Sequence, residues 1–338
     1  MHNVLSAKGG KMRRRTITTL LGGAAVGCAV PAAAQQSPMP VVGILSSSSA
    51  EAPAGRIDAI EVALRQAGYV VGQTVRIEYR YGDNRPERLP RLAEELVALP
   101  ANVIMTSGGP GPIFAAKAET TTIPIVFAPL SDPVQLGVVA SLNRPGGNIT
   151  GIAALTIELD PKRLELLNEL VPAKGPFGIL FNPARPDSRQ QLAAIESAAN
   201  SVGRELHLVP SSAPPDIEGA LGSLARHSVV GVLVAADAFF AGQHKRIVSA
   251  MATHGLPAIY QWREFVDAGG LASYGPSLFE SYRQAGILAA RILKGEKPGN
   301  LPVQQPTKFE LVLNVKMARS LGLTVPLALL GRADVVVE

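Results

Sequence analysis

Val41-Val42-Gly43-Ile44-Leu45 is an unbroken apolar run, which Ser46-Ser47-Ser48-Ser49 and then an amphipathic segment at 56–67 follow. Apolar residues recur in that segment at the spacing of one helix face, and Gly68 ends the pattern. A strand that is apolar at every position is typical of a parallel sheet with helices on both faces. The stretch therefore predicts a strand–helix unit inside an α/β sheet.

The same unit recurs along nearly the whole chain. A first series, with strands expected at 74–81, 102–106 and 123–127, ends in a turn-rich break at 143–148. Ahead of this break, the pattern predicts a short helix at 132–141. A second series has strands expected at 177–181, 205–209, 229–234 and 258–260, and a further strand–helix unit begins with a strand expected at 270–274. Two such series predict two doubly wound, Rossmann-like lobes joined by a hinge. We expect residues 41–158 plus 270–298 in lobe 1, and 159–269 plus 299–338 in lobe 2.

The N-terminus has the pattern of an export signal over residues 1–34. Lys8, Lys11 and Arg13-Arg14-Arg15 carry a positive charge that equals the net +5 of the whole chain, and no acidic residue balances them there. A modestly apolar stretch at 17–30 leads to the small-residue site Pro31-Ala32-Ala33-Ala34. The stretch is shorter than the roughly 20 residues of a membrane-spanning helix. We therefore expect a periplasmic protein.

Two features of this leader leave alternatives open. Arg14-Arg15-Thr16-Ile17 resembles a twin-arginine signal, but Thr18 departs from the pattern, so the general secretory route stands equally. Ala25-Val26-Gly27-Cys28 resembles a lipobox, which would anchor the chain through Cys28. A free protein that discards its only cysteine with the leader is the reading that we prefer.

The composition of the remaining chain excludes several function classes. Its charge is close to zero and only 5% of the chain is aromatic, which argues against binding of nucleic acid. Without Cys28 it has neither a disulfide nor a thiol nucleophile.

Candidate ligand contacts follow the expected strands, because ligands of open α/β sheets bind at the carboxyl ends of strands. In the first lobe these candidates are hydroxyl and glycine residues suited to an anion, namely Ser46, Ser47, Thr106, Ser107 and Gly108. The alternative to ligand binding is that these segments, after the strands expected at 41–45 and 102–106, form solvent-exposed turns. Asp132 precedes Pro133 and fits a helix cap better than a ligand contact.

The second lobe offers candidates for the opposite end of a ligand. Asn182 and Asp237 stand where strands end, and Asp237 precedes Phe239-Phe240, a setting that suits a cationic group such as an α-ammonium. Tyr260, Trp262 and Tyr274 are candidate apolar walls. Caps and core packing are the alternatives for these five residues.

Enzyme signatures are missing from the sequence. It contains no Gly-x-Ser-x-Gly elbow and no phosphate-binding loop, and its histidines lack the spacing of metal ligands. We therefore expect no catalytic residue, no metal and no cofactor.

Several stretches form a combination that is specific when they are taken together. They are Ile123-Pro124-Ile125-Val126-Phe127, Asp132-Pro133-Val134, Ser141-Leu142-Asn143-Arg144-Pro145-Gly146-Gly147-Asn148-Ile149-Thr150-Gly151, Lys162-Arg163-Leu164-Glu165-Leu166-Leu167, Arg263-Glu264-Phe265-Val266-Asp267-Ala268-Gly269-Gly270-Leu271 and Gln305-Pro306-Thr307-Lys308-Phe309-Glu310-Leu311. With these stretches the chain resembles, from about Val41 to its end, the tryptophan/tyrosine-type family of bacterial ABC transporter substrate-binding proteins. The resemblance implies a type I periplasmic-binding-protein fold, with three crossovers between the lobes and the ligand in the cleft.

The expected function is capture of a small solute, with an amino acid or related carboxylate as one candidate. The solute would pass to a membrane permease that an ATPase drives. A sensing subunit, which presents its closed form to a membrane receptor, is the alternative on the same fold. We expect a monomer that binds no nucleic acid and does not act as an enzyme.

Overall fold

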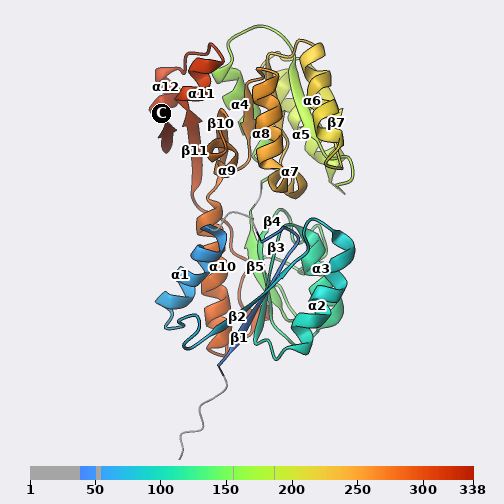
Figure 1. Ribbon diagram of the computed structural model, residues 1–338, viewed down its shortest axis with the longest axis vertical. Coiled ribbons are helices and arrows are strands. Elements are labelled where there is room, and N and C mark those ends of the chain that lie inside the picture. The colour runs from blue at the N-terminus through green and yellow to red at the C-terminus, as the bar shows by residue number, and fades with distance from the viewer. Residues whose placement is uncertain (1–38, 51–54, 155, 186) are drawn as a thin grey trace, which may run out of the picture. The chain divides into compact units, whose positions relative to one another are not determined.

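The strands of the computed structural model form two separate sheets (Figure 1). The model describes residues 39–50, 55–154, 156–185 and 187–338. The expected export signal and Cys28 lie outside these residues. Within them, no helix has the length and apolar character that crossing a membrane requires.

The first sheet has five strands, all parallel, in the order β2-β1-β3-β4-β5. Their bounds are β1 (Val41–Ser46), β2 (Arg76–Tyr81), β3 (Val103–Ser107), β4 (Ile125–Leu130) and β5 (Ile149–Ala153). The helices of this lobe are α1 (Gly55–Gln66), α2 (Leu89–Ala98), α3 (Pro110–Glu119) and α10 (Leu278–Leu293), with a 3-10 turn at Pro86–Arg88. We call this unit the first lobe.

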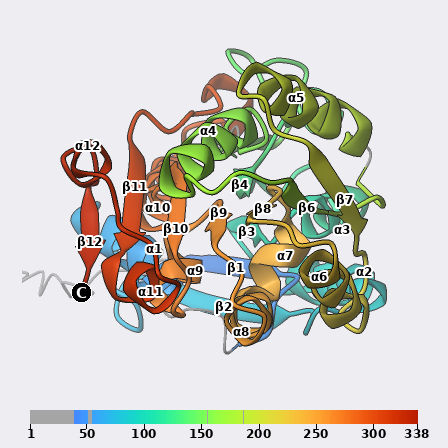
Figure 2. The same cartoon turned by 90° about the horizontal axis from the view of Figure 1, so that it is seen from above.

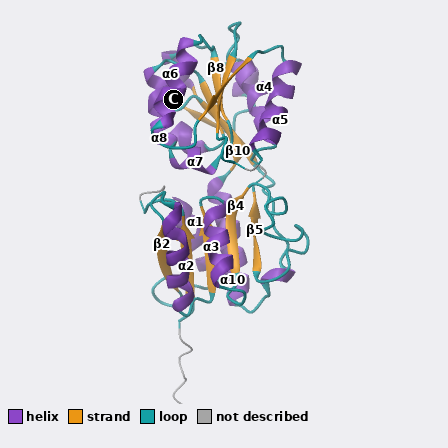
Figure 3. Cartoon of the chain, turned by 90° about the vertical axis from the view of Figure 1, so that its right-hand side faces the viewer, coloured by secondary structure: helices purple, strands orange, loops and turns teal. Residues whose placement is uncertain are grey.

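Alternation along β1 explains why helices cover both faces of this sheet. Val42 and Ile44 belong to the core that includes α1 and α10, whereas Val41 and Leu45 belong to the core under α2 and α3. Figures 1 and 3 show these two pairs of helices flanking the strands. The apolar run in the sequence therefore reflects a strand that is buried on both sides.

The second sheet has seven strands in the order β12-β11-β10-β9-β8-β6-β7. They are β6 (Phe177–Phe181), β7 (Leu206–Pro210), β8 (Gly231–Val234), β9 (Ala258–Tyr260), β10 (Ala272–Pro276), β11 (Phe309–Asn314) and β12 (Val335–Val337). Its helices are α4 (Asp160–Leu170), α5 (Ser188–Ser201), α6 (Asp216–Arg226), α7 (Ala238–Gly242), α8 (His244–Thr253), α9 (Arg263–Asp267), α11 (Val315–Ser320) and α12 (Leu327–Leu330). In Figure 2, α4 and α5 lie on one side of this sheet, and α6, α7 and α8 on the other. This is the second lobe.

The chain passes between the lobes three times, as the resemblance implies. The first crossover leads from β5 to α4, and the second from β10 to α10. The third crossover begins after Gln304, which forms an isolated β-bridge with Ile152 of β5, and it leads into β11. The predicted α/β class with two doubly wound lobes is confirmed.

Four details differ from the expectations. Residues 132–141 form turns and no helix. Strand β10 pairs with β9 and β11, so it lies in the second lobe, and only α10 returns to the first. Residues 299–304 lie in the first lobe, where Val303 joins the core under α2 and α3. The β10–β11 pair is antiparallel, which makes the second sheet mixed.

The α1–α10 contact depends on the absence of a side chain at Gly286. A Cβ there would lie 2.8 Å from Cβ of Ala63 and 3.0 Å from the carbonyl oxygen of Ile60. We predict that Gly286→Ala lowers the free energy of unfolding by about 1–3 kcal/mol, because the two helices must separate.

A matched variant has the opposite expectation. Nothing lies within 4 Å of a Cβ built at Gly219 in α6, so Gly219→Ala raises stability by up to about 1 kcal/mol through helix propensity. Urea unfolding of both variants measures the two changes. Equal effects of the two substitutions would contradict the packing argument.

Candidate functional site

A cavity of about 310 Å³ lies between the lobes, and loops at the carboxyl ends of strands line it. The first lobe contributes the loops that follow β1 and β3, together with residues of α1 and α10. The second lobe contributes the loops that follow β6, β8 and β9. We call this cavity the interlobe pocket.

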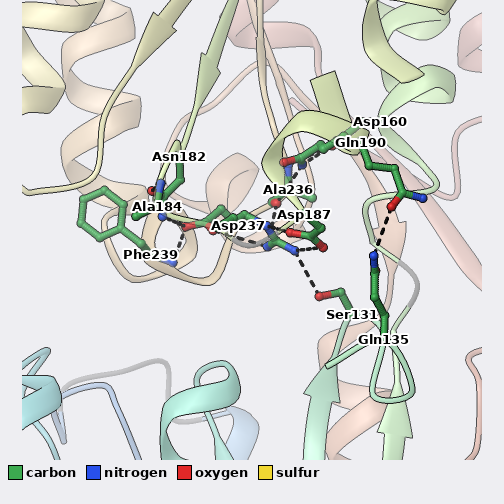
Figure 4. A network of polar contacts seen from close by, with 12 residues as sticks. Ser131, Gln135, Asp160, Asn182, Ala184, Asp187, Gln190, Ala236, Asp237 and Phe239 are labelled. Atoms are coloured by element: carbon green, nitrogen blue, oxygen red, sulfur yellow. Dashed lines mark hydrogen bonds and ion pairs between the residues drawn. The ribbon is translucent and has the colours of Figure 1, made fainter. Parts of the chain in front are cut away.

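Arg185 organises the charged wall that the second lobe presents, between Asp187 and Asp237, two aspartates that Figure 4 labels. Its Nε and one Nη donate to the two carboxylate oxygens of Asp187 over 2.8 and 2.9 Å. The other Nη donates to Asp237 over 3.4 Å and to the carbonyl oxygen of Ala236 over 3.3 Å. Two aspartates thus surround one guanidinium, and this wall carries an excess of one negative charge.

Asp237 is held in place from several sides. One carboxylate oxygen accepts hydrogen bonds from the backbone N–H groups of Phe239 and Phe240 at the start of α7, and from the amide of Asn182. Its side chain is only 5% exposed. Burial raises the pKa of Asp237 above the usual range, although the charge of Arg185 and these hydrogen bonds oppose the shift.

The first lobe faces this wall with backbone and hydroxyl groups. Gly108 and Gly109 follow β3 with φ angles of 86° and 97°, which residues with side chains rarely adopt. The hydroxyl of Ser47 donates to the carbonyl oxygen of Gly108 over 2.7 Å. A Cβ on Gly108 would lie 2.0 Å from that hydroxyl, so only glycine fits this loop.

Arg56, at the start of α1, brings a cation to the first-lobe side of the pocket. Its guanidinium lies 5.8 Å from the ring centroid of Tyr282, which belongs to α10. The Nε of Arg56 is buried and has no hydrogen-bond partner among the residues that the structure describes. A buried donor without a partner is costly, which suits a residue that meets an anionic ligand.

A second ion pair lies beneath the pocket floor, and both of its side chains are fully buried. Arg163 donates to Asp160 over 2.5 Å, to the carbonyl oxygen of Thr156 over 2.9 Å and to that of Tyr274 over 2.6 Å. Asp160 in turn accepts hydrogen bonds from the N–H of Ala236. This pair therefore joins the crossover between β5 and α4, together with strand β10, to the loop that carries Asp237.

Five of the residues expected from the sequence line the interlobe pocket: Ser47, Gly108, Asn182, Asp237 and Trp262. Three others line an adjoining cavity in the first lobe: Ser46, Thr106 and Ser107. The three that line neither cavity are Asp132, Tyr260 and Tyr274.

These last three have structural contacts instead. Tyr260 is 1% exposed and stacks on Phe265 at 4.6 Å between ring centroids, so it packs in the core of the second lobe. Tyr274 lies against Phe309. The carboxylate of Asp132 accepts from two backbone N–H groups of the turn that follows it.

The sequence analysis missed Arg56, Arg185 and Asp187. The last two belong to the same loop as Asn182, so the rule that selected Asn182 could have found them. Arg56 carries no comparable signal, because its place in the pocket depends on how α1 packs against the sheet. Among the residues described, no group of three or more His, Cys, Asp or Glu side chains could hold a metal ion.

The buried pair predicts a non-additive response to substitution. Asp160→Leu and Arg163→Met should each cost about 3–5 kcal/mol of folding free energy, because each leaves one buried charge unpaired. The double variant should cost less than the sum of the two. Denaturant unfolding of all three variants measures the coupling, and strict additivity would argue against the pair.

Comparisons with known proteins agree with this architecture. The family model described as ABC transporter substrate binding protein matches residues 41–337. A protein named tyrosine-binding protein from Clostridioides difficile is 27% identical over 262 residues, which is 77% of this chain and 74% of that protein.

Two solved structures share the fold at close to full length. A conserved domain protein from Vibrio cholerae has a TM-score of 0.80 at 25% identity, and covers 88% of this chain and 99% of its own. An ABC domain in complex with L-Trp from Streptococcus pneumoniae has a TM-score of 0.79 at 22% identity, with the same coverage. Because the family match spans nearly all the described residues, this chain belongs to the family of ABC transporter substrate-binding proteins.

Proposed function

We propose that the chain is the exported receptor of an ABC transporter, and that it captures a small zwitterion, an amino acid or a related carboxylate, in the interlobe pocket. The observation that carries this proposal is the separation of charge across the pocket. An excess of negative charge faces it from the second lobe, and a cation with hydroxyl and backbone groups faces it from the first.

The ligand's ammonium group binds at the second-lobe wall. Asp237 and Asp187 both pair with one guanidinium, that of Arg185, so one added cation balances the formal charge of this cluster. Asp237 is preorganised by hydrogen bonds from Asn182 and the start of α7, which lowers the entropy that binding costs.

The ligand's carboxylate binds on the opposite side. Arg56, Ser47 and Ser48 line the first-lobe wall together with Gly108 and Gly109. Charge-assisted hydrogen bonds of this kind are roughly twice as strong as neutral ones. A zwitterion therefore gains contacts from both lobes at once, and it favours the closed arrangement of the lobes.

The relatives support this choice of ligand and set its context. One relative is named for tyrosine, and the L-Trp complex shares the fold. After closure the receptor delivers its solute, chemically unchanged, to a membrane permease and its ATPase. We place it in the periplasm as a monomer.

Removal of one charge tests the ammonium site. Asp237→Asn should weaken binding of any amino acid that the wild type binds by a factor of roughly 30 or more, because losing one partner of a buried charge pair costs about 2 kcal/mol or more. Calorimetric titration of protein refolded free of carried-over ligand provides the measurement.

The control for this variant is Asp267→Asn, which removes a half-exposed carboxylate paired with Arg263 on α9. It should leave affinity unchanged. If both variants bind as the wild type does, the ammonium is held elsewhere. If the wild type binds no amino acid at all, the proposed ligand class is wrong.

Acidification should release the ligand. Protonation of Asp237 removes the charge that holds the ammonium group, and the raised pKa of this carboxyl places the loss at a higher pH than for an ordinary aspartate. Because the pKa of Asp237 is higher in the folded than in the unfolded state, its protonation favours folding. Affinity should therefore fall before the protein unfolds, and Asp237→Asn should flatten this dependence. Titrations from pH 8 to pH 4 would reveal it.

A further inference from the structure

A second cavity, of about 240 Å³, lies wholly within the first lobe between α1 and the sheet. We call it the α1 cavity. Its walls are mainly apolar and come from β1, α1, β3 and β4, as in Ile44, Ile57, Ile60, Met105 and Ala128. A single water needs only about 10–15 Å³ of such space, so the cavity has room for a group of several heavy atoms.

The α1 cavity adjoins the interlobe pocket. Arg56 and Tyr282 line both spaces. The loop after β1 also divides between them, because Ser46 lines the α1 cavity while Ser47 and Ser48 line the interlobe pocket. The loop after β3 divides in the same way, with Ser107 on one side and Gly108 on the other. The anion-binding groups of the first lobe thus stand at the boundary between the two spaces.

We infer that the uncharged, largely apolar group of the ligand enters the α1 cavity while its charged groups stay in the interlobe pocket. This inference rests on the proposed function. A carboxylate held at the boundary by Arg56 and the serine loop directs the rest of the ligand toward one of two spaces. The second-lobe wall is charged, whereas the walls of the α1 cavity are mainly apolar and include the rings of Tyr81 and Tyr282. The charged side chains that line the α1 cavity are Arg56, at its boundary with the interlobe pocket, and Asp58 on α1. Transfer of an apolar group from water favours the α1 cavity.

The inference makes Ile57 a residue that selects the size of the ligand. Its side chain is half-buried on α1 and packs beside Ile60 on the cavity wall. A larger side chain there fills the cavity, and a smaller one enlarges it. The side chain at position 57 therefore determines how large an apolar or aromatic group can bind, whereas the charged end of the ligand binds in the interlobe pocket.

The test is a ladder of ligands that share one charged end: glycine, L-alanine, L-valine, L-phenylalanine and L-tryptophan. Ile57→Phe should weaken binding of the bulky members about tenfold or more, since a single misfitting methylene already costs about that factor. Affinity for the small members should stay within about twofold. Ile57→Ala should leave the bulky members bound at least as well as in the wild type.

Val97→Phe is the matched control, because Val97 is also half-buried on a helix but packs against the other face of the same sheet. This variant should bind every ligand of the series with the affinity of the wild type. Methyl NMR of Ile57 and Met105 gives a direct second measurement, because a bound ring should shift both signals. Bulky ligands that bind Ile57→Phe as tightly as the wild type, and leave these methyl signals unmoved, would overturn the inference.

Failure of the proposed function gives a different result. If no amino acid shifts the melting temperature, the zwitterion site is wrong, and indole, which carries neither charged group, becomes the probe. Shifts of the Ile57 and Met105 methyl signals with indole, lost in Ile57→Phe, would support the α1 cavity as an apolar site. No shift at millimolar indole would overturn it.

Discussion

The buried Asp160–Arg163 pair is the interaction on which the arrangement of site and hinge depends. A charge removed from water is tolerated when it is paired and hydrogen-bonded, and backbone groups supply several of the bonds here. One Nη of Arg163 has no hydrogen-bond partner among the residues that the structure describes. Arg163 donates to the carbonyl groups of Thr156, in the crossover between β5 and α4, and of Tyr274, in strand β10. The pair therefore connects α4 to one crossover and to the strand that precedes another. Asp160 connects the same α4 to the loop that carries Asp237, through the N–H of Ala236.

The two lobes present different chemical groups to the interlobe pocket. The second lobe presents an ion-pair cluster with little exposure, in which Arg185 contacts both Asp187 and Asp237. The first lobe supplies backbone and hydroxyl groups on a glycine loop that bulkier residues could not form. Neither wall alone complements a zwitterion, so the proposed function couples binding to the approach of the lobes.

Much of the fold follows from local patterns that the sequence displays. Strands such as β1 and β6 are apolar at nearly every position because helices cover both faces of their sheets, and this pattern persists in any arrangement of the chain. The expected helix at 132–141 was wrong because Asp132 caps a turn as readily as a helix. The expectation that β10 belongs to the first lobe was wrong, because the sequence of a strand does not determine which of two sheets it joins.

The sequence by itself determined the fold class, the repeat of strand and helix, and the strand-end loops that line the interlobe pocket, because local periodicity and strand ends depend on neighbouring residues only. The tertiary structure alone decided which side chains of those loops meet. Tyr260 ends a strand yet turns into the core, whereas Arg56 reaches the pocket from a helix that no strand-end rule selects. Both outcomes follow from packing between segments distant in the chain, which leaves no periodic trace in the sequence.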